Sequence, residues 1–181
     1  MNTGEIQVRT ESADETRAIA SAMAKGCRPG DVLLLVGDLG AGKTTFAQGF
    51  AAALGVAEQV TSPTFALMRQ YSCVDGNDFG IKVLLHVDVY RMDRLQEIVD
   101  LGLGELVEED SIALVEWGDL AAPIIGKGAL TVHIESGDGA GADGVVVNET
   151  KLMSITGNGP DWLFRTIEME SILLPWSAHQ S

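Results

Sequence analysis

The first apolar positions of the chain predict a strand followed by an amphipathic helix. Glu5–Arg9 has the length and pattern of a short strand. Apolar residues within Ala18–Met23 then recur on one side at helical spacing. Ser12 and Glu15 stand at capping-box spacing, in which the serine accepts from a free backbone N–H and the glutamate reaches back. We therefore expect a helix from Ser12 to about Lys25.

A second strand and helix follow, joined by a glycine-rich loop. Val32–Val36 is a continuous apolar run, which is typical of a strand covered on both faces in a parallel sheet. From Lys43 to Leu54 the apolar residues recur at helical spacing, and Gly55 marks the expected stop. The predicted order is therefore strand, loop, helix.

The rest of the chain predicts a small α/β domain with two hairpins. The expected elements are strands Ala66–Cys73 and Lys82–Tyr90 around the turn Asp75–Asp78, a short helix Arg94–Val99 ending near Gly102 and Gly104, a buried strand Ile112–Glu116, strands Leu130–Glu135 and Val145–Glu149, and a last helix Asp161–Glu170. The sequence has no internal repeat and no domain linker. We predict one domain over residues 1–175 and a loose tail over residues 176–181.

Composition narrows the class of protein. The chain has 181 residues, of which 46% are hydrophobic, enough for one domain with its own core. No run of about 18 apolar residues is present, so no membrane span is expected. Met1–Ala20 carries polar and charged residues throughout and lacks the apolar stretch and cleavage site of a secretory signal. These features predict a cytoplasmic protein.

Cysteine usage and charge exclude further classes. Cys27 and Cys73 are far apart and have no His or Cys at metal-ligand spacing, so we expect buried, reduced thiols. The formal net charge is −14. Affinity for nucleic acid comes largely from Lys and Arg that neutralise phosphates, so this charge argues against unaided, high-affinity binding to RNA or DNA. Any role in nucleic-acid metabolism is expected to run through a partner protein.

The strongest chemical signal is a phosphate-binding loop. Gly37 and Gly42-Lys43-Thr44 match the Walker A pattern G-x-x-x-x-G-K-[ST], placed between a buried strand and a helix as the motif requires. Glycines let successive backbone N–H groups turn inward around phosphate oxygens, and the helix N-terminus adds partial positive charge. Lys43 is expected to neutralise the β- and γ-phosphates, and Thr44 to bind Mg²⁺. The predicted nucleotide-binding residues of this segment are Gly37, Asp38, Leu39, Gly40, Ala41, Gly42, Lys43, Thr44 and Thr45.

Two acidic residues are candidates for the metal or base role that such a loop needs. Strand alternation puts His86, Asp88 and Tyr90 on one face with Leu84, which favours a site lining over a plain core. Glu116 closes an apolar strand, at the edge of the sheet where α/β proteins bind ligands. The sequence alone does not divide the two roles between Asp88 and Glu116.

Four segments together resemble one family. These are Gly37–Thr45, Ser62–Phe65 (Ser-Pro-Thr-Phe), His86–Arg91 (His-Val-Asp-Val-Tyr-Arg) and Val115–Trp117 (Val-Glu-Trp). In this order and at these spacings, they are similar to the TsaE family, also called YjeE, of bacterial ATPases needed to make threonylcarbamoyladenosine in tRNA. The likeness runs from Ser12 to about Glu135. It departs at Ser136–Asp143, which is small or acidic where the family often has an arginine.

The resemblance implies a P-loop NTPase fold, a single compact α/β domain with a mixed parallel and antiparallel sheet flanked by helices. It implies binding of ATP and Mg²⁺ and an ATPase that is weak alone. The implied partner is the TsaB–TsaD heterodimer, in which TsaD transfers threonylcarbamoyl to N6 of adenosine 37, and hydrolysis resets that complex. The resemblance thus implies that this chain acts on tRNA only indirectly, through these partner proteins.

The resemblance also implies roles for residues. Lys43 holds phosphate, while Thr44 and Glu116 hold Mg²⁺. Asp88 is required for hydrolysis, so the implied catalytic residues are Lys43, Asp88 and Glu116. Thr64 belongs to a switch-like segment, Trp117 flanks the nucleotide or the partner surface, and Ala13 at the start of the first helix lies on the adenine side. For Trp117 the residues themselves favour packing over a lid or partner contact.

Two other functions use the same loop. A small-molecule kinase usually carries an arginine-rich lid, and the seven arginines of this chain show no such cluster. A GTP-driven switch would carry an Asn-Lys-x-Asp segment, which the sequence lacks. An ATPase serving tRNA modification is therefore the preferred hypothesis, with the kinase as the alternative.

Overall fold

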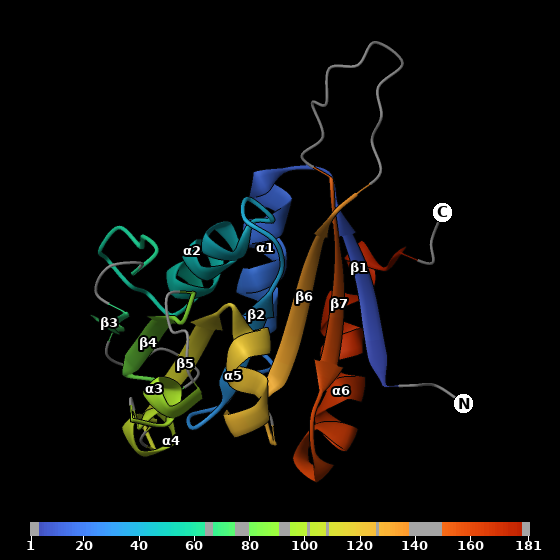
Figure 1. Cartoon of the computed structure of the whole chain (residues 1–181). Coiled ribbons are helices and arrows are strands. Elements are labelled where there is room, and N and C mark those ends of the chain that lie inside the picture. Colours follow the sequence, from blue (N-terminus) through green and yellow to red (C-terminus); the bar gives the residue numbers. More distant parts are fainter. Residues whose placement is uncertain are drawn as a thin grey trace.

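A seven-stranded sheet forms the middle layer of the protein (Figure 1). The computed structural model describes residues 4–63, 67–74, 80–90, 95–100, 102–107, 109–125, 127–137 and 150–178. The strands are β1 (Glu5–Thr10), β2 (Val32–Val36), β3 (Met68–Ser72), β4 (Val83–Asp88), β5 (Ser111–Glu116), β6 (Leu130–Ser136) and β7 (Lys151–Gly157). Their order across the sheet is β1-β7-β6-β2-β5-β4-β3.

The centre of the sheet is parallel and its two sides are antiparallel. β2 pairs in parallel with both β5 and β6, and β4 pairs in parallel with β5. β3 is antiparallel to β4, β7 to β6, and β1 to β7. This is the mixed sheet that the resemblance implied. Because the parallel strands β2, β5 and β4 end at one edge, the residues that follow them are brought together there.

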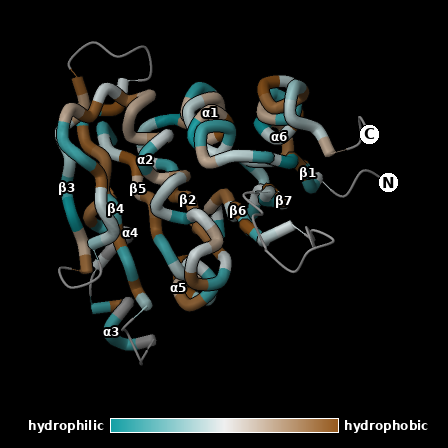
Figure 2. Tube along the Cα trace, turned by 90° about the horizontal axis from the view of Figure 1, so that it is seen from above, coloured by the Kyte–Doolittle hydropathy of each residue, from teal (hydrophilic) through white to brown (hydrophobic). Residues whose placement is uncertain are grey.

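Helices cover both faces of the sheet (Figures 1 and 2). On one face lie α1 (Ala13–Ala24), α2 (Lys43–Ala53) and α6 (Pro160–Leu173), and on the other α3 (Leu95–Asp100) and α5 (Gly118–Ile125). A further short helix, α4 (Leu103–Leu106), follows α3. Within β2, Leu33 and Leu35 pack toward the first face and Leu34 toward the second. The continuous apolar run is thus explained, since both faces of this strand are buried.

The capping box at the start of α1 is confirmed in one half only. Ser12 is the N-cap residue, and its Oγ accepts from the backbone N–H of Glu15 at 3.1 Å. The Glu15 carboxylate reaches back one residue farther than predicted, accepting from the N–H of Glu11 at 2.6 Å. Both contacts still satisfy backbone donors near the helix end.

Three features differ from the sequence prediction. The hairpin partner of β6 is β7, Lys151–Gly157, which was not predicted as a strand. The predicted strand Val145–Glu149 lies outside the described residues. The predicted turn Asp75–Asp78 also lies outside them. Helix α5 was also not predicted. Gly104, near which the predicted short helix was expected to end, instead lies within α4.

The C-terminal segment is held in place up to Ser177, two residues farther than predicted. A 3₁₀ helix spans Leu174–Trp176, Trp176 packs against the main core, and Ser177 forms a bridge with Val8 on the edge strand β1. The partly buried Trp176 ring stabilises this segment by removing some apolar surface from water. Cys27 and Cys73 are free and buried, as predicted. Among the described residues no helix has the length and apolar character needed to cross a membrane.

Gly49 lets the helices α1 and α2 approach each other closely. A Cβ on Gly49 would lie 2.4 Å from the backbone oxygen of Arg17, far inside contact distance. We predict that Gly49→Ala lowers the free energy of unfolding by about 1–3 kcal/mol through overpacking, although helix propensity alone favours Ala by about 1 kcal/mol. Thermal unfolding measures this, with exposed Ala52→Gly as a control that reports propensity alone. A higher melting temperature for Gly49→Ala would contradict the close approach.

Candidate nucleotide and magnesium site

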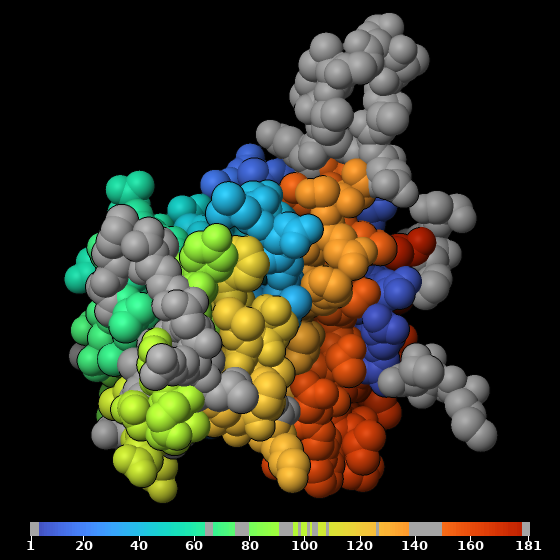
Figure 3. Space-filling model, viewed as in Figure 1, coloured from blue at the N-terminus to red at the C-terminus, as the bar shows by residue number. Residues whose placement is uncertain are grey.

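The loop between β2 and α2 is built as an open phosphate cradle. Gly40 and Gly42 have φ of +79° and +110°, a backbone region that favours glycine, and a Cβ on either would meet no atom within 4 Å. Gly37 packs closely on β6, since its Cβ would lie 2.4 Å from the backbone oxygen of Ile134. The loop is therefore fixed on its sheet side and open on the other. Figure 3 shows this segment, in light blue, at the surface beside the orange β6.

Lys43, the first residue of α2, lies at the centre of this cradle. Its side chain is buried, and Nζ donates to the backbone oxygens of Gly37 at 2.6 Å and Asp38 at 2.9 Å. The same Nζ lies 4.0 Å from the centroid of the Trp117 ring. Burial lowers the pKa of the Lys43 ammonium, and the nearby carboxylates of Glu116 and Asp88 partly oppose this. The ammonium is thus placed where a phosphate would satisfy it.

The lowered pKa of Lys43 predicts an alkaline loss of nucleotide affinity. Phosphate binding needs the ammonium form of Lys43, so the affinity for nucleotide should fall as pH rises. This fall should begin at a lower pH than it would for an ordinary lysine of pKa 10.5. The free energy of unfolding is expected to change in the opposite direction. Between the folded and unfolded pKa values the unfolded chain holds more protons, so the free energy of unfolding rises with pH in that window. Nucleotide titrations from neutral to alkaline pH test this. Lys43→Arg, whose guanidinium stays charged, should show no such fall.

Thr44 and Glu116 meet beside the loop. Thr44 Oγ1 donates to Glu116 Oε1 at 3.1 Å, with Oε2 at 3.5 Å. Glu116 ends β5, is 3% exposed, and stands opposite Asp88 in the register of β4 and β5. A hydroxyl and two carboxylates at one edge form a hard oxygen donor set of the kind Mg²⁺ prefers.

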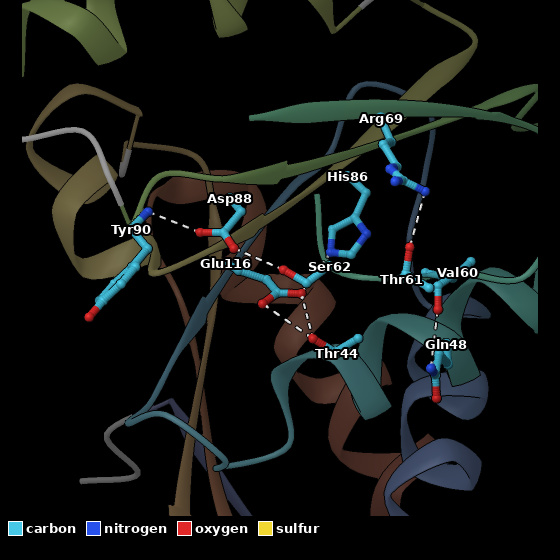
Figure 4. Close-up of polar contacts among 10 residues, drawn as sticks. All are labelled: Thr44, Gln48, Val60, Thr61, Ser62, Arg69, His86, Asp88, Tyr90 and Glu116. Atoms are coloured by element: carbon cyan, nitrogen blue, oxygen red, sulfur yellow. Dashed lines mark hydrogen bonds and ion pairs between the residues drawn. The ribbon is translucent and has the colours of Figure 1, made fainter. Parts of the chain in front are cut away.

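Asp88 is held by both of its oxygens. Oδ2 accepts from Ser62 Oγ at 2.9 Å, and Oδ1 accepts from the backbone N–H of Tyr90 at 2.9 Å (Figure 4). Side chains on α2 and β3 hold the segment that carries Ser62. Gln48 donates to the backbone oxygen of Val60 at 3.1 Å, and Arg69 donates to Thr61 Oγ1 at 3.0 Å. No role was predicted for Ser62, because no spacing rule links it to Asp88, 26 positions later.

His86 shares the buried face of β4 with Asp88, as strand alternation predicted. The imidazole is fully buried, and Nε2 lies 2.8 Å from Glu116 Oε1. The sequence placed His86 on the site-lining face but assigned it no contact. Its contact with Glu116 comes from the parallel pairing of β4 with β5.

Two hollows flank the loop and share Trp117. The first has a volume of about 360 Å³ and is lined by Leu39, Gly40, Gly42, Lys43, Thr44, Thr45, Ser62, Asp88, Tyr90, Glu116 and Trp117. The second, of about 500 Å³, is lined by Val36, Gly37, Asp38, Ala41, Trp117, Asp119, His133, Ile134, Glu135 and Ser136. Every predicted residue of the segment 37–45 therefore lines one hollow or the other.

Three predicted site residues lie outside the segment 37–45 and the two strand-end carboxylates. Trp117 has φ of +60°, unusual for a bulky residue, its ring lies 4.6 Å from that of Tyr90, and it lines both hollows. Ala13 lies in the first turn of α1 and lines neither hollow. Thr64 lies outside the described residues.

The donors present fit a magnesium–nucleotide complex better than a free metal ion. Within the described part of the chain, no group of three or more His, Cys, Asp or Glu side chains is arranged to hold a metal. Mg²⁺ usually takes one or two carboxylates from a protein and completes its shell with phosphate oxygens and water. Glu116 and Thr44 match that incomplete donor set, and the neighbouring loop offers the place for phosphate.

The fold and this site define the protein class as a P-loop α/β protein. Parallel strands β2, β5 and β4 end at one edge, and the loop leaves β2 at that edge to enter α2. A profile of the family described as "Threonylcarbamoyl adenosine biosynthesis protein TsaE" matches residues 10–142. The chain belongs to the TsaE family.

Individual relatives agree with this assignment. The TsaE protein of Bacillus subtilis is 48% identical over 116 residues, which cover 64% of this chain and 68% of the relative. The TsaE protein of Streptomyces coelicolor is 38% identical over 148 residues, covering 81% and 93%. The crystal structure of Bacillus subtilis YdiB superposes with a TM-score of 0.71 at 33% identity, covering 92% of this chain and 95% of that one.

Proposed function

We propose that this protein binds ATP with Mg²⁺ and hydrolyses it in the biosynthesis of threonylcarbamoyladenosine in tRNA. The relatives' names supply the pathway. The observation that carries the chemistry is the convergence of Lys43, Thr44, Glu116 and Asp88 on one hollow. Cation, hydroxyl and carboxylates are the groups that phosphoryl transfer requires in such loops.

Each residue then has a separate task. The loop N–H groups and the Lys43 ammonium hold the phosphates, and Thr44 with Glu116 would hold Mg²⁺, which supplies charge neutralisation at the phosphate oxygens. Asp88, fixed by Ser62 and by the Tyr90 N–H, is oriented to accept a proton from a water molecule or to position it. Trp117, which contacts Lys43 and lines both hollows, is placed to flank the bound nucleotide.

The partner in this proposal is the TsaB–TsaD heterodimer, with tRNA met only through it. The net charge of −14 supports a protein partner over direct contact with a polyanion. Hydrolysis by this chain would reset that complex between turnovers.

The deciding experiment measures ADP formation by the purified chain with and without a purified TsaB–TsaD pair. We expect slow turnover alone, faster turnover with the pair, and no Mg²⁺-independent activity. Absence of stimulation by a cognate, active pair would contradict the partnership. Turnover that required an added hydroxyl acceptor would instead favour a kinase.

A further inference from the structure

His86 is a buried polar side chain that the proposed chemistry does not yet use. It lies in the middle of β4 with 0% of its surface exposed. Burying an imidazole costs free energy unless its nitrogens find partners. Nε2 is 2.8 Å from Glu116 Oε1, whereas Nδ1 has no hydrogen-bond partner among the described residues. Glu116 is therefore the only hydrogen-bond partner of this ring among the described residues.

The contact fixes which atom donates. A carboxylate only accepts, so Nε2 carries the hydrogen and His86 is the donor. Glu116 Oε1 thus receives two donors, His86 Nε2–H and the Thr44 hydroxyl at 3.1 Å. Oε2 has the longer contact, 3.5 Å to Thr44, and is the less engaged oxygen. The two donors together set the rotation of the carboxylate.

We propose that His86 is a positioning residue, which orients the Glu116 carboxylate for Mg²⁺ without touching metal or nucleotide. This inference rests on the proposed function. Protein ligands of metals are commonly held by such outer hydrogen bonds, and their loss typically lowers metal affinity about 10- to 100-fold. The strand register explains the placement. His86 precedes Asp88 by two residues on the same face, and Asp88 is opposite Glu116.

Two variants separate this role from a packing role. The side-chain amide of His86→Gln extends to about the position of Nε2 and is able to donate to Glu116, whereas that of His86→Asn ends near the position of Nδ1 and falls short. Mg²⁺ is titrated by calorimetry into each protein with a non-hydrolysable ATP analogue present. We expect His86→Asn to weaken Mg²⁺ binding by about 10- to 100-fold, and His86→Gln to retain most of it.

Tyr71→Phe is the matched control for disturbance of the same packing. Tyr71 is buried, its ring lies 6.5 Å from that of His86, and its hydroxyl also has no partner among the described residues. This variant should keep the wild-type Mg²⁺ affinity. Equal Mg²⁺ affinity in the wild type and His86→Asn would overturn the positioning role. Absence of Mg²⁺-dependent binding in the wild type would instead overturn the proposed function.

The wild-type protein offers a second test, which decides the matter even where both variants fail to fold. Nitrogen-15 NMR of the imidazole rings distinguishes the two tautomers of a buried histidine. We expect His86 to carry its hydrogen on Nε2. This hydrogen should exchange slowly with solvent, because it is buried and bonded to Glu116. A hydrogen on Nδ1 and none on Nε2 would overturn the inference.

Discussion

Lys43→Ala is expected to weaken Mg-ATP binding by about 30-fold or more while leaving the fold intact. The substitution removes a buried ammonium that the structure places between two loop carbonyls and the carboxylate cluster. Loss of one partner in a buried charged contact costs about 2–5 kcal/mol, or roughly 30-fold or more in affinity. Stability should not fall, because the lowered pKa of Lys43 shows that its charge is disfavoured by burial in the folded chain.

Lys25→Ala is the control for this experiment. Lys25 is exposed at the end of α1, so its removal changes the net charge equally without touching the loop. Nucleotide binding by fluorescence or calorimetry and thermal unfolding are measured on both variants. Unchanged affinity in Lys43→Ala would mean that this loop does not hold the triphosphate.

Asp88→Asn and Glu116→Gln are expected to fail in different ways. Asp88→Asn removes the proton acceptor but keeps an oxygen for the Tyr90 N–H, so hydrolysis should fall about 10²- to 10⁴-fold with little change in nucleotide affinity. Glu116→Gln removes charge next to Thr44, so the Mg²⁺ concentration needed for half-maximal activity should rise.

Single-turnover hydrolysis at several Mg²⁺ concentrations separates the two effects. Excess Mg²⁺ should restore part of the activity of Glu116→Gln and none of that of Asp88→Asn. If the two variants share one Mg²⁺ dependence, the division of base and metal roles between these carboxylates is wrong. The sequence alone left that division open.

Local sequence patterns predicted the elements that carry the loop. The apolar run Val32–Val36 and the helical spacing after Lys43 depend on nearest neighbours, so strand, loop and helix followed from the sequence alone. Glu116 was predicted as a candidate because it ends an apolar strand at the edge where parallel strands bind ligands. Asp88 was predicted because strand alternation places it on one face with His86 and Tyr90. These predictions needed no knowledge of the tertiary contacts.

The missed features depend on contacts distant in sequence. β7 was not recognised because the choice between two neighbouring strand-like segments rests on pairing with β1 and β6, far away along the chain. Helix α5 begins at Gly118 and contains Pro123, two residues that usually argue against a helix. The contacts of Ser62 with Asp88 and of His86 with Glu116 likewise exist only once the sheet has formed.

The proposed function depends above all on binding of a triphosphate and Mg²⁺ by the segment 37–45. Titration calorimetry of Mg-ATP into the folded wild-type chain tests it most directly. The site described here predicts heat that saturates at one nucleotide per chain and is strongly reduced when Mg²⁺ is chelated. No heat with Mg-ATP, either alone or with the TsaB–TsaD pair present, would contradict it.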